Sequence, residues 1–256
     1  MRSLLSALFV VSFVFLLSAV GQAIDDESLV LYFPFDEGTG DIARDPSGNN
    51  NDGTINGAEW TGDGKIGKAL SFDGNDTVTV KDNDTLDVTS LTVEAWIKPS
   101  TDWQQGIGTN PGIFHKLDYP NRTGYLLYLE DAFGTASLYV PQTDTYIRSI
   151  TNVWKKGIWY HVASTYDEKE GEGKTYVNGK LETTEKSSGK LPPNNQDLII
   201  GMYINTFDGI IDEAAIYNRA LTEEEINQDM NNGVIFAVSP AGKLTTMWGS
   251  LKNDLR

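Results

Sequence analysis

The stretch Tyr176-Val177-Asn178-Gly179-Lys180-Leu181 decides the fold class. Asn-Gly stands here between two short runs of strand-forming residues. A type I′ turn needs positive φ at both central positions, and Asn followed by Gly is the pair that adopts it most readily. The segment therefore predicts an antiparallel β-hairpin.

Similar runs, rich in β-branched and aromatic residues, recur on both sides of this hairpin and are separated by Gly, Asn and Asp. They are Leu29–Phe33, Ala69–Phe72, Thr77–Val80, Leu91–Lys98, Tyr125–Leu129, Ala136–Val140, Thr145–Ile150, Trp159–Tyr166, Lys174–Val177, Leu181–Thr184, Leu198–Met202 and Gly209–Tyr217. Short runs at this spacing are typical of an all-β protein, either a sandwich or a barrel.

One short helix is expected near the end of the strand pattern. Thr222 and Glu225 form a capping box ahead of Ile226 and Met230, and Asn231-Asn232-Gly233 ends the segment. No internal repeat and no Pro/Ser-rich linker precedes residue 234. We therefore expect one domain over residues 24–233, followed by a C-terminal extension over 234–256.

The first 23 residues have the layout of a secretory signal peptide. Arg2 gives a positive start, residues 4–20 are almost wholly apolar, and Gly21-Gln22-Ala23 ends the run with small residues. An uncleaved membrane anchor is the alternative, although the apolar run is at the short limit for a membrane span. We expect cleavage after Ala23 and a secreted product, extracellular or periplasmic, without membrane insertion.

Charge and cysteine content exclude several classes of function. The formal net charge is −16, which argues against binding a nucleic-acid backbone or an anionic membrane surface, because both require an excess of Lys and Arg. The chain has no cysteine, which excludes disulfides, thiolate metal sites and cysteine nucleophiles.

Acidic loops rich in Asn and Gly are the most distinctive local feature, and the segment 45–53 (DPSGNNNDG) is the densest. Such loops suit tight turns, because Asx side chains bond their own backbone and Gly accepts positive φ. They also suit Ca²⁺, which prefers carboxylate, amide and carbonyl oxygens. The spacing is not that of an EF-hand, so a calcium site would have to combine distant loops.

Several phrases together carry a resemblance to a known family. They are Tyr32–Gly38, Asp45–Asn49, Gly67–Gly74, Leu91–Ile97, Trp159–Ala163, Tyr176–Gly179 and Phe207–Leu221. In this order and spacing the chain resembles the LamG-like jellyroll family, within the concanavalin A-like lectin/glucanase superfamily, over about residues 29–233.

The resemblance implies a two-sheet antiparallel jellyroll. It also implies a non-catalytic adhesion or carbohydrate-binding module that often holds one calcium ion. Carried over onto this sequence, it places Asp36, Asp45 and Asn50 in amino-terminal loops and Asp212 on the last core strand, and these four are the expected calcium ligands. The alternative role for Asp212 is a carboxylate that accepts backbone amides near the edge of the sandwich.

Catalysis has weak support in the sequence. A retaining glycosidase needs two carboxylates about 5 Å apart, and the Glu-x-Asp-x-x-Glu arrangement of the β-glucan-cleaving relatives is absent. Glu94 is the best isolated candidate, but it has no acidic partner on its own strand. His115 and His161 lack zinc-binding spacing. We expect no enzyme, and keep a polysaccharide hydrolase or lyase and a purely structural surface protein as alternatives.

Two aromatic residues are the candidate ligand contacts. Trp103 and Tyr119 lie in polar loops that contain Gly or Pro, and nothing in their local sequence would bury them. Exposed aromatic rings with neighbouring polar groups can stack on the faces of sugars. The expected partner is therefore a glycan or an extracellular protein, bound through Trp103 and Tyr119.

Overall fold

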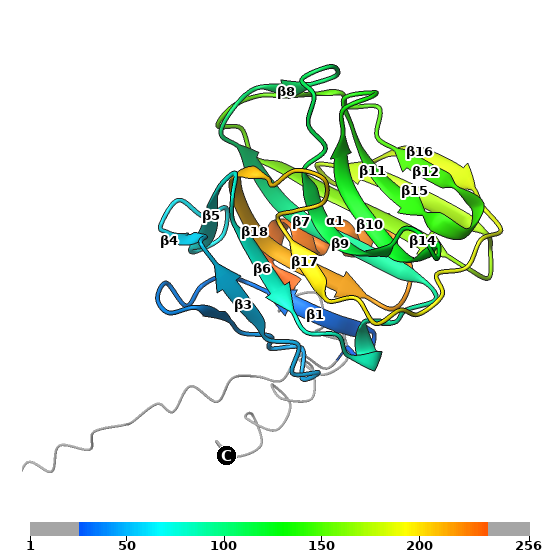
Figure 1. The fold of residues 1–256 in the computed structure, drawn as a ribbon, viewed down its shortest axis with the longest axis horizontal. Helices are drawn as coiled ribbons and strands as arrows, with labels where there is room; N and C mark the ends of the chain where they lie inside the picture. Colours follow the sequence, from blue (N-terminus) through cyan, green and yellow to red (C-terminus); the bar gives the residue numbers. More distant parts are fainter. Residues whose placement is uncertain (1–25, 235–256) are drawn as a thin grey trace, which may run out of the picture.

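The computed structural model describes residues 26–234, so the predicted signal peptide (1–23) and all but the first residue of the predicted extension (234–256) lie outside it. Within the described residues two large antiparallel sheets pack face to face (Figure 1). The prediction of an all-β, two-sheet jellyroll sandwich is confirmed.

The first sheet has the strand order β16-β15-β14-β7-β18-β5-β4, and β1 also pairs with β18. The long strand β18 bends at a bulge, pairing with β5 through its first half and with β1 through its second. The strands are β1 (Leu29–Phe33), β4 (Glu59–Thr61), β5 (Ala69–Asp73), β7 (Leu91–Pro99), β14 (Tyr160–Asp167), β15 (Glu172–Val177), β16 (Lys180–Lys186) and β18 (Asp208–Tyr217).

The second sheet has the order β12-β11-β10-β9-β17-β6-β3-β2, and a two-stranded ribbon of β8 and β13 lies apart from both sheets. Its strands and those of the ribbon are β2 (Ile42–Ala43), β3 (Gly53–Asn56), β6 (Thr77–Val80), β8 (Trp103–Gln104), β9 (Gly112–Asp118), β10 (Thr123–Glu130), β11 (Thr135–Val140), β12 (Thr145–Arg148), β13 (Val153–Trp154) and β17 (Leu198–Ile200). Two 3₁₀ turns, η1 (Asp84–Leu86) and η2 (Pro141–Thr143), precede β7 and β12.

The hairpin between β15 and β16 has the predicted geometry. Asn178 and Gly179 have φ values of 50° and 74°, as a type I′ turn requires. Val177 pairs directly with Lys180, so the turn contains only those two residues. The hairpin prediction from Asn-Gly is confirmed.

The core between the sheets follows the alternation of side chains along each strand. On β7, Val93, Ala95 and Ile97 enter the core, and Leu127 and Leu138 enter it from the opposite sheet. The intervening residues of each strand point to the outer faces. The sandwich therefore has two outer faces, one on each sheet.

Helix α1 (Glu223–Asn232) covers the outer face of the first sheet and lies behind that sheet in Figure 1. Its capping box is present as predicted, with Thr222 and Glu225 bonding reciprocally. Ile226 packs with Tyr32 and Tyr217 of that sheet. Among residues 26–234 no helix covers the second sheet, and its outer face is here called the open face.

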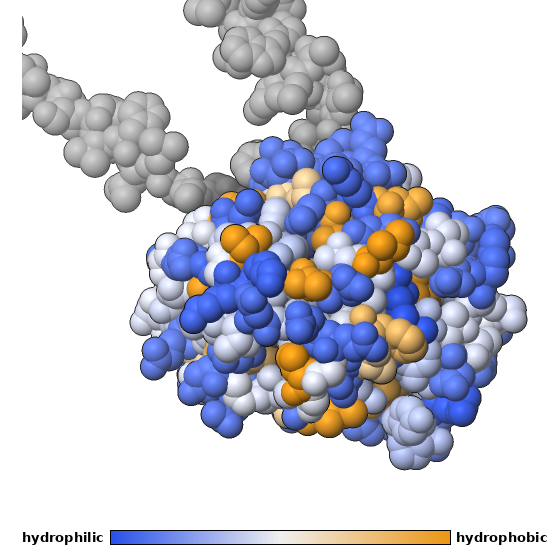
Figure 2. All heavy atoms as spheres, turned by 90° about the horizontal axis from the view of Figure 1, so that it is seen from above, coloured by the Kyte–Doolittle hydropathy of each residue, from blue (hydrophilic) through white to orange (hydrophobic). Residues whose placement is uncertain are grey.

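No helix within the described residues is long and apolar enough to cross a membrane. At the end of the sandwich that carries the β8–β13 ribbon, apolar residues form separate groups among hydrophilic ones (Figure 2).

Candidate ligand-binding face

The outer face of the second sheet carries an apolar cluster where a soluble sheet would ordinarily be polar. Leu126 and Tyr128 of β10 pack with Leu117 of β9 and Tyr139 of β11, and Tyr146 and Tyr203 pack against this cluster. Burial raises the pKa of the Tyr128, Tyr139 and Tyr146 phenols. They therefore stay neutral in the physiological range.

Aromatic rings on this face form a continuous stack. Tyr119 stacks on Tyr139 with ring centroids 6.5 Å apart, and Tyr139 stacks on Tyr146 at 4.6 Å. The Arg148 guanidinium then lies between the rings of Tyr146 and Phe133, at 4.6 and 4.4 Å. Tyr119 and Phe133 end the stack and are 57% and 50% exposed. Tyr119 therefore has a ring face available to a ligand.

Two polar hollows lie next to one another on this sheet. The first, about 320 Å³ and here called the Asp118 hollow, is lined by Asp118, Asn121, Thr123, Pro193, Asn194, Asn195 and Gln196. The second, about 310 Å³ and called the His115 hollow, is lined by His115, Leu117, Asn195, Gln196, Asp197 and Ile199. Amide side chains are the commonest polar groups in both.

Arg148 and His115 contribute no free positive charge to this face. Arg148 forms a two-pronged ion pair with Glu130, with distances of 2.7 and 2.9 Å from Nε and Nη2. Burial lowers the pKa of His115, so its imidazole is neutral at physiological pH. The hollows therefore present neutral hydrogen-bonding groups beside carboxylates.

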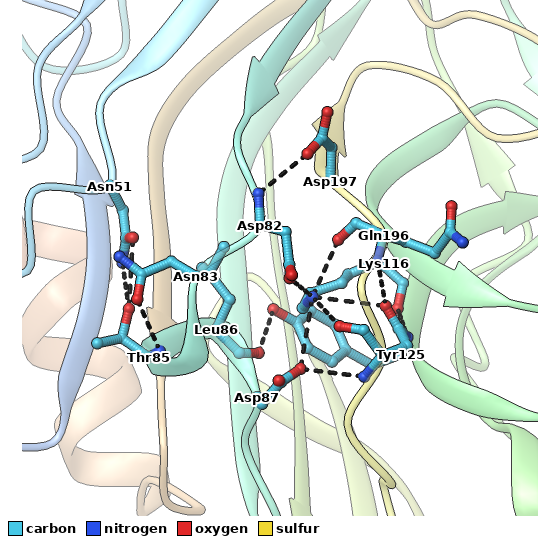
Figure 3. A network of polar contacts seen from close by, with 11 residues as sticks. Asn51, Asp82, Asn83, Thr85, Leu86, Asp87, Lys116, Tyr125, Gln196 and Asp197 are labelled. Carbon is cyan, nitrogen blue, oxygen red and sulfur yellow. Dashed lines mark hydrogen bonds and ion pairs between the residues drawn. The ribbon is translucent and has the colours of Figure 1, made fainter.

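Behind the hollows, Lys116 of β9 points into the sandwich and is fully buried. Its Nζ donates to Asp82 Oδ1 at 2.6 Å and to the carbonyl oxygens of Gln196 and Asn194 at 2.9 and 3.0 Å (Figure 3). Asp87 Oδ1 lies 3.4 Å away. This network ties the segment that lines both hollows to β9 and to the η1 region.

A laminin-G family model of the concanavalin A-like lectin/glucanases superfamily matches residues 72–227. The chain belongs to this superfamily. The match begins in β5 and ends in α1, so it covers most strands of both sheets and the open face. No curated protein matches the chain.

Solved structures with a similar fold include a domain of an extracellular arabinanase and two toxin binding domains. Domain 4 of AbnA, a GH43 extracellular arabinanase from Geobacillus stearothermophilus solved with arabinotriose, is 26% identical with a TM-score of 0.60. The alignment covers 79% of this chain and 98% of that domain.

Two toxin domains are more distant in sequence. The binding domain of Paraclostridial Mosquitocidal Protein 1 is 19% identical, with a TM-score of 0.64 and 80% of this chain covered. The binding domain of botulinum neurotoxin DC, solved with rat synaptotagmin II, is 16% identical, with a TM-score of 0.60 and 80% covered. This chain spans 52% and 51% of those domains, about half of each, and the likeness shows the fold alone.

The two predicted ligand contacts have different environments in this superfamily member. Tyr119 is exposed at the end of the aromatic stack, as expected. The expectation that nothing would bury Trp103 is wrong, because Trp103 is only 4% exposed. It pairs with Trp154 in the β8–β13 ribbon, and its Nε1 donates to Thr109 Oγ1 at 3.3 Å. The indole lines a separate hollow of about 200 Å³ with Ile107 and Phe207.

The four predicted calcium ligands do not come together as one set. Asp36 and Asp212 both bond the loop 65–68. Asp36 Oδ1 accepts the backbone N–H of Lys68, and Asp212 Oδ2 accepts those of Lys65 and Ile66. Asp212 thus has the amide-accepting role that was its alternative. Within residues 26–234 no group of three or more acidic or histidine residues has metal-binding geometry.

The other two predicted ligands lie in the 45–53 loop and serve its own turns. Asp45 accepts the backbone amides of Tyr32, Ser47 and Asn51. Asn50 is exposed with a φ of 60°, a conformation that Asn tolerates. These contacts are the turn chemistry that was the alternative to a calcium site.

Buried acids surround Glu94 beneath α1, and the sequence did not predict this cluster. Glu94 is 1% exposed, and neither of its carboxylate oxygens has a hydrogen-bond partner among the described residues. Burial, and then Asp229, raise the pKa of Glu94. The acidic neighbours Glu213 and Asp229 come from β18 and α1, and His161 Nε2 of β14 lies 3.7 Å from Glu94 Oε2, so the neighbours of Glu94 lie on other elements than its strand. None of the three hollows described above includes these acids.

Proposed function

We propose that this protein is a secreted, non-catalytic module that binds neutral oligosaccharides on the open face of the second sheet. The observation that carries the proposal is the exposed ring of Tyr119, which follows Asp118 of one of two amide-lined hollows, on the sheet that α1 leaves uncovered.

The chemistry of the face suits a sugar. An aromatic ring stacks on the apolar face of a sugar, and side-chain amides can both donate to and accept from hydroxyl groups. The net charge of −16 repels sulfated or uronic chains. A neutral, hydroxyl-rich chain is therefore the favoured ligand class, and the similar AbnA domain solved with arabinotriose supports it.

Catalysis is not part of the proposal. Glu94 and its acidic neighbours lie beneath α1, where no hollow among those described gives a substrate access to them. The binding-domain character of the structural neighbours supports this view, although one of them is a domain of a glycoside hydrolase. Release of reducing sugar from any polysaccharide by the pure protein would contradict a purely binding role.

The test is a calorimetric titration with arabinotriose, xylotriose, cellotriose and maltotriose, and with a sulfated oligosaccharide as the charged comparison. We expect at least one neutral trisaccharide to bind in the millimolar to micromolar range, since a few contacts of this kind give about 4–8 kcal/mol. Binding of the sulfated chain alone would contradict the proposal.

A protein ligand is the second candidate. Ile107, Phe133, Val153 and Ile158 are 40–52% exposed. Val153 belongs to β13 and the other three lie on connections between strands, and exposed apolar groups can mark protein contacts. An absence of glycan binding together with capture of one extracellular protein would favour this candidate.

We also propose a structural calcium ion held by Asp36 and Asp212, without Asp45 and Asn50. Burial, and also the charge of Asp36, raise the pKa of Asp212, to about 7. A divalent cation between these two carboxylates would relieve their repulsion.

The export part of the proposal is tested by sequencing the amino terminus of protein recovered outside the cell. We expect that terminus near Ile24.

A further inference from the structure

The two hollows of the open face share two residues. Asn195 and Gln196 line both the Asp118 hollow and the His115 hollow, so they form a ridge between them, here called the amide ridge. Both side chains are exposed. Neither side-chain amide makes a hydrogen bond to another residue within 26–234. The side chain of the neighbouring Asn194, by contrast, bonds Lys116 and accepts the backbone N–H of Gln196.

Lys116 fixes the orientation of this ridge. Its side chain is shielded from solvent, and its Nζ donates to the carbonyl oxygens of Asn194 and Gln196 at 3.0 and 2.9 Å. Asp82 and Asp87 balance the buried charge. A buried ammonium whose donors converge on backbone oxygens restrains the backbone more strongly than a surface contact.

In the segment 194–196 the backbone carbonyls and the ridge side chains therefore face opposite ways. Its carbonyl oxygens turn inward to Lys116, while the side chains of Asn195 and Gln196 turn to solvent. In Figure 3 the Gln196 carbonyl is directed at Lys116 and its side chain points away. The face therefore presents paired amide donors and acceptors rather than backbone carbonyls.

We infer that Asn195 and Gln196 contact the ligand directly, that Lys116 is their positioning residue, and that the ligand is a neutral oligosaccharide of at least two sugar units. The inference rests on the proposed function. Chain length follows from the lining of the hollows, because both share the ridge residues, while one adds Pro193 and Asn194 and the other adds Asp197 and Ile199. A chain that crosses the ridge occupies both hollows, and a single sugar occupies one.

The test compares each trisaccharide named above with its monosaccharide by calorimetry. We expect the parent protein to bind the responsive trisaccharide at least tenfold more tightly. Asn195→Ala and Gln196→Ala should each weaken trisaccharide binding about 3- to 10-fold, the effect of losing one or two hydrogen bonds. Asn56→Ala is the matched control, since Asn56 is an exposed amide on β3 of the same sheet, and it should leave binding unchanged.

Lys116 is tested by Lys116→Met and Lys116→Arg, with circular dichroism as the check on folding. We expect folded Lys116→Met to lose the preference for trisaccharide over monosaccharide. Lys116→Arg should keep that preference, since Arg keeps the charge and the donors. A purely structural role would lower the melting temperature without changing that preference. If Lys116→Met does not fold, the ridge variants and Lys116→Arg decide the question.

The outcomes distinguish a failure of the ridge assignment from a failure of the proposed function. A parent protein that binds trisaccharide, with both ridge variants at parental affinity, overturns the ridge assignment and leaves the proposed function standing. Equal affinity of the parent for monosaccharide and trisaccharide overturns the chain-length inference. No binding of any probe by the parent overturns the proposed function and this inference with it.

Discussion

At the scale of single residues, Tyr119 and Trp103 show what local sequence can and cannot reveal. Both lie in segments that read as polar loops, yet one is 57% exposed and the other 4%. Trp103 is buried because it pairs with Trp154 across the β8–β13 ribbon, a contact between positions about fifty residues apart in the sequence. No local pattern around Trp103 contains that information.

The two residues should therefore respond differently to substitution by alanine. Tyr119→Ala should weaken oligosaccharide binding several-fold with little change in melting temperature, because the exposed ring contributes about 1 kcal/mol of stacking. Trp103→Ala should destabilise the fold by about 3–5 kcal/mol, the usual cost of removing a buried Trp. Calorimetry and thermal unfolding measure both. The opposite pattern, a stable Trp103→Ala with impaired binding, would contradict these assignments.

Buried acids predict how stability depends on pH. Burial raises the pKa of Asp212 to about 7 and that of Glu213 to about 8, against ordinary values near 4. Because the folded state binds these protons more tightly, their stabilising effect is complete below about pH 4 and is lost as pH rises through 7 to 8. We expect the free energy of unfolding in EDTA to fall by a few kcal/mol between pH 6 and pH 9.

Glu213→Gln is the variant that isolates this effect, because its neutral side chain can still bond the Tyr32 hydroxyl, which now donates to Glu213 Oε2 at 2.6 Å. It should flatten the pH dependence, and the exposed Glu224→Gln should not. Urea unfolding at the two pH values measures the slope. A parental protein more stable at pH 9 than at pH 6 would show that these carboxyls are ionised in the folded state.

At the scale of elements, every predicted strand is present, and the strands that were not predicted have physical reasons. Strands β2, β4, β8 and β13 have two or three residues each, too few to show any alternation. Strand β3 has four residues and begins at Gly53, the last residue of the 45–53 loop, so it reads as part of that loop. Strand β9 contains Lys116, a charged residue at a core position, so its apolar pattern is broken. The segment that binds Lys116 comes from a distant loop, so the sequence could not predict the ridge.

The β15–β16 hairpin gives the test at this scale. Gly179 has a φ of 74°, and a Cβ there would collide with the Asn227 side chain of α1. Gly179→Ala should therefore cost more than the ~1–2 kcal/mol of a left-handed residue alone. Gly157→Ala is the matched control, because Gly157 has a φ of 70° and open space around it. Equal losses in urea unfolding would show that the hairpin does not pack on α1.

At the scale of the whole molecule, a chain with a charge of −16 and no cysteine should gain stability from the proposed calcium ion. A ligand that binds only the folded state at a hundredfold excess over Kd adds about 2.7 kcal/mol. We expect millimolar calcium to raise the melting temperature by several degrees over EDTA. Asp212→Ala should abolish most of that shift, and Asp45→Asn should keep it. Superimposed curves for the parent would remove calcium from the account.

The asymmetry of the sandwich is the central feature at this scale. Helix α1 covers one sheet, while the other presents the aromatic stack, the two hollows and the amide ridge. The resemblance of the sequence to its family was enough to predict two sheets and a binding role. Which sheet is open depends on where α1 docks, and that is set by contacts of Ile226 and Trp96 across the chain.

The most direct test of this account is a nuclear magnetic resonance titration of ¹⁵N-labelled protein with the trisaccharide that binds best. We predict amide shift changes confined to β9, β10, Tyr119 and the segment 193–197, with α1 and the strands beneath it unchanged. Shift changes centred on α1 or on the β8–β13 ribbon, with the open face silent, would contradict the claim that this sheet face is the binding site.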